Sequence, residues 1–374
     1  MRSLHLLLLP VWTGVFVSAT PVPGKSKNKA PAAVATMDSK ACTFSDANQA
    51  IANKRKCSTI TLRNMQVPAG KTLALDDLAD NTHVIFSGKM TFGYQEWTGP
   101  LISISGKGIT ITGAPGNIID GQGRRWWDGK GTNSGKKKPQ FFNAHNLVNS
   151  QIRGLNILNT PAHAMSISAC DTLGVYNVNI DDSAGDSLGG HNTDGFDVGT
   201  SKNIIISGCT VKNQDDCLAI NSGTNITFTG GYCSGGHGLS IGSVGGRTDN
   251  AVKHVRITNS KVVDSDNGIR VKTLSGGKGS VEDVAFDNIA LIRIKGTGVT
   301  IQQDYQNGRP TGKPTKGVPI TNLSVTRISG NVMPGGTNYY VLCADCANWK
   351  WTQNKVVSGT KADVKAGVPA GVVF

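Results

Sequence analysis

Short apolar segments recur along the chain, each with one outward-facing residue between two apolar ones. Six of them align by eye: Met165-Ser166-Ile167, Phe196-Asp197-Val198, Leu218-Ala219-Ile220, Leu239-Ser240-Ile241, Ile269-Arg270-Val271 and Val299-Thr300-Ile301. A second set lies inside the same repeats: Ile204-Ile205-Ile206, Ile226-Thr227-Phe228, Val255-Arg256-Ile257, Val284-Ala285-Phe286 and Leu323-Ser324-Val325. Alternation with period two predicts strands, and a spacing of about 20 to 30 residues is typical of solenoids.

Several short strands in each repeat, together with 47 glycines, predict an all-β, single-domain right-handed parallel β-helix. At this repeat length we expect about ten coils. A helical solenoid would need amphipathic runs with a period of 3.6 residues, which are almost absent. The best helix candidate, Ser45 to Ala52, is expected to cap the open amino-terminal end. No linker interrupts the later repeats, so we expect residues 41–374 to form one domain.

The first 40 residues differ from the repeats. Met1-Arg2-Ser3, the apolar run from Leu4 to Val17 and the small residues that follow predict a signal peptide over residues 1–19. Residues 20–40 are rich in Lys and Ala, and we expect them to be a propeptide. No later segment is long and apolar enough to span a bilayer. We therefore expect a secreted, extracellular protein that does not bind membranes.

The chain of 374 residues carries a formal net charge of +13, which favours an anionic partner. Nucleic acid is not expected, because the Lys and Arg residues are scattered, aromatic residues make up only 6% and no nucleic-acid motif is visible. We expect a monomer without cofactor or metal ion.

Eight cysteines are typical of an exported protein. We expect three disulfides: Cys42–Cys57, Cys217–Cys233 and Cys343–Cys346. The last is a C-x-x-C motif, but it stands alone and no histidine follows it, which favours a disulfide over a zinc or redox site. Cys170 and Cys209 are expected to be buried free thiols. Asn225-Ile226-Thr227 and Asn322-Leu323-Ser324 are glycosylation sequons.

Polar residues that could carry chemistry occupy equivalent positions in successive repeats. Counting back two residues from the first apolar position gives Asp194, Asp216, His237 and Asn267. Strands in register would stack these residues in one column, with neighbouring coils about 4.8 Å apart. Asp215 precedes Asp216 and reaches the same cleft. Three crowded carboxylates cannot all ionise easily, so at least one should have a raised pKa.

Two cations extend this cluster. Arg270 and Lys272 alternate with Ile269 and Val271, which places both cations outside the core. Singly, each polar residue has an ordinary interpretation, as a turn residue or a solvated charge. In a shared column they instead suit acid–base cleavage of an acidic polymer.

Five motifs in this order resemble the signature of the polygalacturonases, glycoside hydrolase family 28, and most of all its fungal endo-acting members. The motifs are Asn192-Thr193-Asp194, Asn213-Gln214-Asp215-Asp216-Cys217, Ser234 to Ser243, Asn267 to Lys272 and Gln302-Gln303-Asp304-Tyr305. The resemblance implies a right-handed β-helix that hydrolyses α-1,4 bonds of polygalacturonate (pectin) with inversion. It also implies roles for single residues. Asp215 is expected to be the general acid, Asp194 and Asp216 to hold and deprotonate the attacking water, His237 to tune the acid, and Arg270, Lys272, Tyr305 and Asn192 to bind substrate.

Other functions remain open at this stage. An exo-acting polygalacturonase would differ in loops that close one end of the cleft, and inspection of the sequence does not resolve those loops. A pectate lyase is also β-helical, but it would need a calcium cluster and a base, and its arginine-rich strand pattern is missing. A non-catalytic pectin-binding solenoid would have lost an aspartate from the column, and none is lost.

Overall fold

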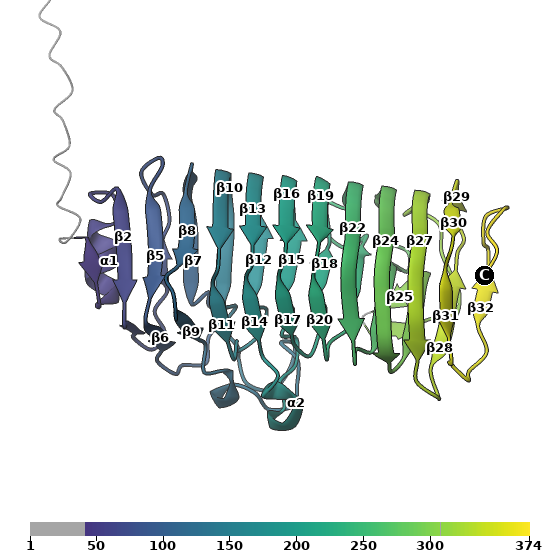
Figure 1. The fold of residues 1–374 in the computed structure, drawn as a ribbon, viewed down its shortest axis with the longest axis horizontal. Helices are drawn as coiled ribbons and strands as arrows, with labels where there is room; N and C mark the ends of the chain where they lie inside the picture. Colours follow the sequence, from purple (N-terminus) through teal and green to yellow (C-terminus); the bar gives the residue numbers. More distant parts are fainter. Residues whose placement is uncertain (1–41, 307) are drawn as a thin grey trace, which may run out of the picture. The chain divides into compact units, whose positions relative to one another are not determined.

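A computed structural model describes residues 42–306 and 308–374. The expected signal peptide and propeptide lie outside these residues. Within them, strands wind into a parallel β-helix, in which each strand pairs with the equivalent strand of the next coil (Figure 1). The only antiparallel pairing among the described strands joins β25 to the short β26 (Arg309–Pro310). Parallel strands prefer right-handed crossovers. The predicted right-handed parallel β-helix is therefore confirmed.

One stack of strands contains all six segments of the first predicted set, in register. Its strands are β4 (Leu73–Leu75), β7 (Ile102–Lys107), β10 (Phe142–Arg153), β12 (Met165–Ser168), β15 (Phe196–Gly199), β18 (Leu218–Ile220), β21 (Leu239–Val244), β23 (Asn267–Leu274), β25 (Thr297–Gln306), β28 (Thr337–Leu342) and β32 (Val364–Ala366). We call this the cleft stack, because the candidate site lies on it.

The second predicted set forms another stack, which runs through twelve strands and is thus slightly longer than the ten coils expected. Its strands are β1 (Thr43–Phe44), β2 (Thr59–Arg63), β5 (His83–Ser87), β8 (Thr110–Gly113), β10, β13 (Asp171–Tyr176), β16 (Ser201–Ser207), β19 (Gly223–Thr229), β22 (Ala251–Val263), β24 (Ser280–Ile294), β27 (Ile320–Val332) and β30 (Lys350–Thr352). β29 (Cys346–Ala347) also pairs with β27.

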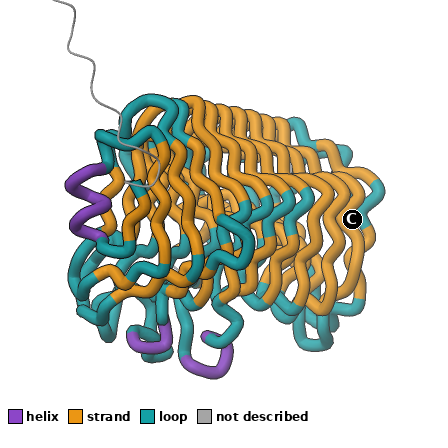
Figure 2. The backbone as a smooth tube through the Cα atoms, turned by 60° about the vertical axis from the view of Figure 1, so that its left-hand side comes forward, coloured by secondary structure: helices purple, strands orange, loops and turns teal. Residues whose placement is uncertain are grey.

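A third stack closes each coil. It consists of β3 (Gln66–Val67), β6 (Lys89–Phe92), β9 (Ile118–Asp120), β11 (Asn156–Leu158), β14 (Asn179–Asp181), β17 (Thr210–Lys212), β20 (Tyr232–Ser234), the later halves of β22, β24 and β27, and β31 (Lys355–Val357). Figure 2 shows the coils side by side, with loops gathered at their edges.

Helical structure is short and lies at the end of the stack or in loops. The predicted capping helix is present as α1 (Ala47–Asn53), at the amino-terminal end of the described coils (Figure 1). It begins where the Asp46 side chain accepts a hydrogen bond from the Gln49 amide at 2.8 Å, as N-cap residues do. A 3₁₀ turn, η1 (Gly123–Arg125), and α2 (Gly185–Leu188) lie in loops.

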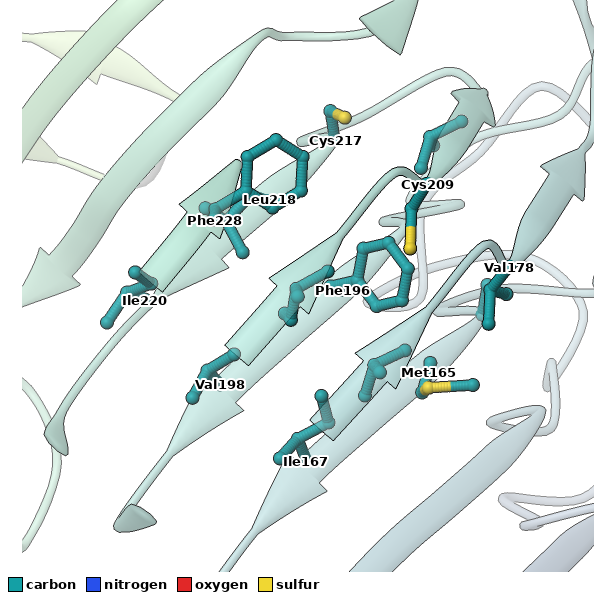
Figure 3. Packing of buried hydrophobic residues seen from close by; sticks show 14 of the residues in the cluster. Met165, Ile167, Val178, Phe196, Val198, Cys209, Cys217, Leu218, Ile220 and Phe228 are labelled. Atoms are coloured by element: carbon teal, nitrogen blue, oxygen red, sulfur yellow. The ribbon is translucent and has the colours of Figure 1, made fainter. Parts of the chain in front are cut away.

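The core is a column of apolar side chains from successive coils (Figure 3). Phe196 and Leu218, for example, pair in register and are both fully buried. The burial of equivalent residues on every coil explains why the apolar-outward-apolar pattern was visible in the sequence. Cys170 and Cys209 are buried free thiols, as predicted, and burial raises the pKa of each to about 11.

The three expected disulfides, Cys42–Cys57, Cys217–Cys233 and Cys343–Cys346, are all formed. Both sequon asparagines are exposed and lie at bends inside strands, with φ of 55° at Asn225 and 54° at Asn322. Their glycosylation stays a prediction. No helix among the described residues is long and apolar enough to cross a membrane.

Candidate active site

The residues expected to share a column do lie on consecutive coils of the cleft stack. Phe196 pairs with Leu218, and Leu218 pairs with Leu239. Asp194, Asp216 and His237 each lie two residues before one of these core positions, in the loops that enter the strands. The register therefore brings them together as the sequence predicted.

The same column contains a histidine that the sequence interpretation missed. His163 lies two residues before Met165, which pairs with Phe196. Its Nε2 is 3.6 Å from Asp194 Oδ1, and its Nδ1 is 3.5 Å from Asp197 Oδ2. Counting back from one more strand would have found His163. Asp197 occupies an outward position of a predicted strand, which gave no signal of its own.

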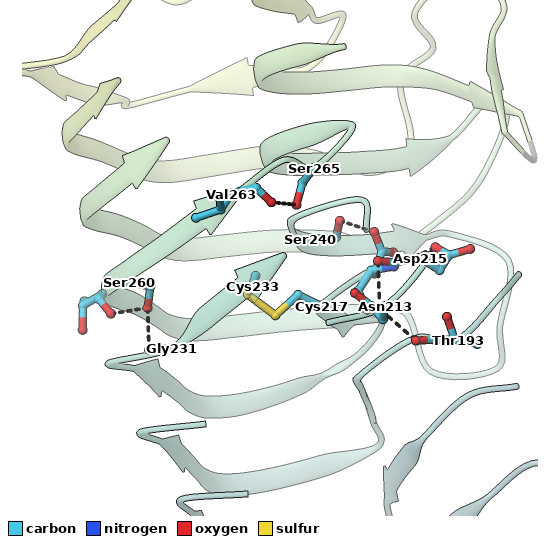
Figure 4. The surroundings of a disulfide bond; sticks show 12 residues. Thr193, Asn213, Asp215, Cys217, Gly231, Cys233, Ser240, Ser260, Val263 and Ser265 are labelled. Atoms are coloured by element: carbon cyan, nitrogen blue, oxygen red, sulfur yellow. Dashed lines mark hydrogen bonds between the residues drawn. A yellow bond between two sulfur atoms is a disulfide. The ribbon is translucent and has the colours of Figure 1, made fainter. Parts of the chain in front are cut away.

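The loops that carry the aspartates are held by one buried amide. Asn213 Nδ2 donates to the carbonyl oxygen of Thr193 at 2.8 Å (Figure 4). It also donates to the carbonyl oxygens of Asp215 and Asp216, both at 3.0 Å. The Asn213 side chain therefore ties the backbones of two loops together. These hydrogen bonds fix the backbone that carries the carboxyl groups.

Asp215 pairs with His237. Its Oδ1 is 2.9 Å from His237 Nδ1 and accepts a hydrogen bond from the Asp216 amide at 2.8 Å. Its Oδ2 accepts one from Asn192 Nδ2 at 2.8 Å. Burial would raise the pKa of Asp215, but the hydrogen bond and charge of His237 hold it below the usual range. Burial lowers the pKa of His237, yet the same contact leaves it raised.

Asp216 is enclosed by cations. Arg270 Nη2 lies 2.6 Å from Asp216 Oδ1, and Lys272 Nζ lies 2.8 Å from Oδ2. Ser240 Oγ donates to Oδ1 at 2.8 Å. The two cations point away from the core, as predicted, but they are not solvated, because the Lys272 side chain is only 7% exposed. In this structure they bind Asp216, and their contact with substrate stays a prediction.

Asp194 lies in surroundings that favour its protonated form. Burial raises its pKa well above the ordinary value, and the neighbouring charges of Asp215, Asp197 and Asp216 raise it further. Its Oδ1 is buried and has no hydrogen-bond partner among the described residues. Burial also raises the pKa of Asp197. The expectation of at least one raised pKa is confirmed at Asp194.

The pKa shifts bear on which carboxyl group holds the proton. An inverting hydrolase needs one protonated and one ionised carboxyl group. The site provides both, but the raised pKa belongs to Asp194, whereas Asp215 was expected to be the acid. Since the two carboxyl groups repel each other when both are ionised, protonation of Asp215 would favour ionisation of Asp194.

A cleft opens beside these groups. Its lining includes residues that the sequence analysis named: Asn192, Asp215, His237, Asn267, Arg270, Lys272 and Tyr305. The other lining residues were not identified from the sequence: Gly131, Asn133, Ser134, His191, Asp266 and Gly308. The Tyr305 ring centroid lies 5.3 Å from Lys272 Nζ. Asn192 and Tyr305 are therefore correctly placed for a role in binding, which itself stays a prediction.

Two groups of side chains bring potential ligand atoms within 4.8 Å of one another: His163, Asp194 and Asp197, and Asp215, Asp216 and His237. We assign no ion to either group. Arg270 and Lys272 already neutralise Asp216, and a histidine contacts both carboxylates of the first group. Function without a metal ion stays a prediction.

Comparisons with known proteins agree with this geometry. Residues 57–372 match the family profile described as glycosyl hydrolases family 28. Endopolygalacturonase 1 of Colletotrichum lindemuthianum is 60% identical over 330 residues, which cover 88% of this chain and 91% of that protein. A probable endopolygalacturonase I of Aspergillus terreus is 52% identical over the full length of both chains.

Solved structures agree as well. Endopolygalacturonase I from Stereum purpureum, crystallised with two galacturonates, aligns with a TM-score of 0.77 at 35% identity, covering 88% of this chain and 98% of that one. An endo-xylogalacturonan hydrolase from Aspergillus tubingensis aligns at 0.76 with 23% identity, over 89% of this chain and 98% of that one, and supports the fold alone. The match to the family profile covers nearly all of the described coils, and this chain therefore belongs to glycosyl hydrolase family 28.

Proposed function

We propose that this protein hydrolyses α-1,4 bonds inside polygalacturonate chains, with inversion at the anomeric carbon. The structural observation that carries the proposal is the cluster of Asp194, Asp215 and Asp216 on adjacent coils, with Arg270 and Lys272 in the same cleft. Paired carboxyl groups suit glycoside hydrolysis, and the cations suit an acidic sugar. Relatives at 60% and 52% identity that are named endopolygalacturonases support both the substrate and endo action.

In this mechanism Asp215 donates the proton that it shares with His237 to the glycosidic oxygen as the bond to the anomeric carbon breaks. Before this transfer, while Asp215 holds the proton, it carries no negative charge next to Asp194, which favours ionisation of Asp194. Asp194 then accepts a proton from a water molecule whose oxygen forms the new bond on the opposite face. One water is consumed and one reducing end appears.

Asp216 has a supporting role in this proposal. Arg270 and Lys272 hold its carboxylate in place by ion pairs, and its negative charge favours the oxocarbenium-like transition state. Both cations also line the cleft, where they can bind a substrate carboxylate. Asn192, which hydrogen-bonds Asp215, keeps that carboxyl group directed into the cleft.

The proposal is tested with Asp215→Asn and Asp194→Asn variants on de-esterified polygalacturonate. Loss of the general acid or base should lower kcat by about 10² to 10⁴. Azide should restore turnover to the variant that lost the base, because azide attacks without needing deprotonation. Rescue of Asp215→Asn rather than Asp194→Asn would reverse the two roles. Proton NMR of the first product should show the inverted anomer.

The product-size distribution separates the alternatives. Mixed oligomers early in the reaction support endo action, whereas monomer alone would indicate an exo-acting enzyme. A lyase would instead produce unsaturated sugars and lose activity with a chelator. Membership of a hydrolase family favours hydrolysis over elimination.

We also infer that the protein is secreted, glycosylated and monomeric. Three disulfides and the amino-terminal apolar run support export. The exposed Asn225 and Asn322 support glycosylation, and an open cleft face supports a monomer. Mass spectrometry of the protein in culture medium, before and after deglycosylation, tests the first two inferences, and light scattering tests the third.

A further inference from the structure

His163 and His237 occupy related positions in the site. His237 lies between Asp215 and Asp266, at 2.9 and 3.7 Å. His163 lies between Asp194 and Asp197, at 3.6 and 3.5 Å. Each histidine thus connects an aspartate of the mechanism to a second carboxylate that the mechanism does not use. The sequence drew attention only to His237.

The two nitrogens of His163 face different carboxylates. A neutral imidazole has one N–H group and an imidazolium has two, so only the protonated form can donate to both Asp194 and Asp197. The facing atoms, Asp194 Oδ1 and Asp197 Oδ2, are buried and have no hydrogen-bond partner among the described residues. Buried ionised carboxylates without a partner are unfavourable, and a cation between them removes much of that cost.

We propose that His163 is a positioning residue that, when protonated, favours the ionised form of Asp194 and orients its carboxyl group. His163 would then set the acid limb of the pH–rate profile. The inference rests on the proposed role of Asp194 as the base. A cation within about 4 to 6 Å typically lowers a carboxyl pKa by about 1 to 3 units, so its removal should act in the opposite direction.

Other titratable and charged groups surround His163, and each has a defined sign. Asp194 and Asp197 favour its protonation, with Asp215 and Asp216 behind them. A second pocket is lined by His163, Asp197, Ser166, Arg247 and Asp249; the Arg247 charge opposes protonation of His163, and the Asp249 charge favours it. His145, on β10, hydrogen-bonds Ser166 of that second pocket through Nε2 at 2.9 Å. Asp194 and Asp197 are the nearest of these groups to His163.

The test compares wild type, His163→Gln, His163→Lys and His145→Gln by kcat/KM on polygalacturonate from pH 3 to 8. We expect the acid limb of His163→Gln to move up by about one to three pH units. His163→Lys restores a positive charge and should keep the limb near its wild-type position. His145→Gln changes a histidine that hydrogen-bonds Ser166 and not these aspartates, and its limb should not move.

A second readout does not depend on turnover. In protein labelled with [¹³C]aspartate, the Asp194 carboxyl resonance should titrate at higher pH in His163→Gln than in wild type. Thermal unfolding checks that every variant is folded. Equal loss of kcat/KM at every pH, or an unchanged Asp194 titration, would overturn the proposal. Failure of wild type to release any reducing ends would instead refute the proposed hydrolysis and leave the Asp194 titration to decide the inference.

Discussion

Asp182 is a fully buried carboxyl group outside the proposed mechanism, and it should make the protein less stable as pH rises. Its side chain is 0% exposed, and its only partner among the described residues is Thr160. The Thr160 amide donates to Oδ1 at 2.5 Å, and the Thr160 hydroxyl lies 2.6 Å from Oδ2. Burial raises the pKa of Asp182 to about 7, against the opposing effect of these hydrogen bonds.

The size and direction of the effect follow from this pKa. A rise from 3.8 to about 7 corresponds to about 4 kcal/mol, since one pKa unit equals about 1.4 kcal/mol. Because the pKa is higher in the folded state, the protonated group favours folding below about pH 4. That contribution declines as pH rises, and it is lost once the pH passes about 7. Asn can keep both hydrogen bonds without ionising.

Urea unfolding of wild type and Asp182→Asn from pH 4.5 to 8.5 measures this effect. We expect the variant to gain stability relative to wild type as pH rises, by about 2 to 4 kcal/mol across the range. Asp181→Asn is the matched control. The Asp181 pKa is lowered, despite partial burial, by hydrogen bonds to Ser183 and Lys212, so its loss should be constant above about pH 5. A difference between Asp182→Asn and wild type that does not change with pH would refute the reasoning.

Three further predictions concern the cleft and the coils. Lys272→Met leaves the buried Asp216 with Arg270 and Ser240 only. We expect the variant to lose about 2 to 4 kcal/mol in unfolding free energy and to show a large loss of kcat. A variant as stable as wild type would contradict this prediction. The disulfide between Cys217 and Cys233 joins residues 16 apart in the sequence. Replacing both cysteines with Ser should lower the free energy of unfolding by about 3 kcal/mol, as measured by urea unfolding of wild type and variant. Asn225→Gln should remove one glycan-sized mass from protein expressed in a eukaryotic host, and an unchanged mass would show that the sequon is unused.

The sequence was sufficient for the solenoid and for the main column of the site. Successive coils bury equivalent residues, so the pattern that includes Phe196 and Leu218 repeats along the chain, and its register is visible without coordinates. Counting from that register placed Asp194, Asp216 and His237 correctly. The disulfide between Cys217 and Cys233 also followed from the positions of these cysteines in adjacent coils.

Only the tertiary structure decided which groups touch. Arg270 and Lys272 lie 54 and 56 residues after Asp216, and their binding to it depends on side chains crossing between coils. The bond between Asp215 and His237, and the position of His163 between Asp194 and Asp197, depend on irregular loops that vary from coil to coil. The assignment of protons depends on burial and on all neighbouring charges at once. A repeating strand pattern carries no information about these quantities, because they arise from three-dimensional contacts rather than from register.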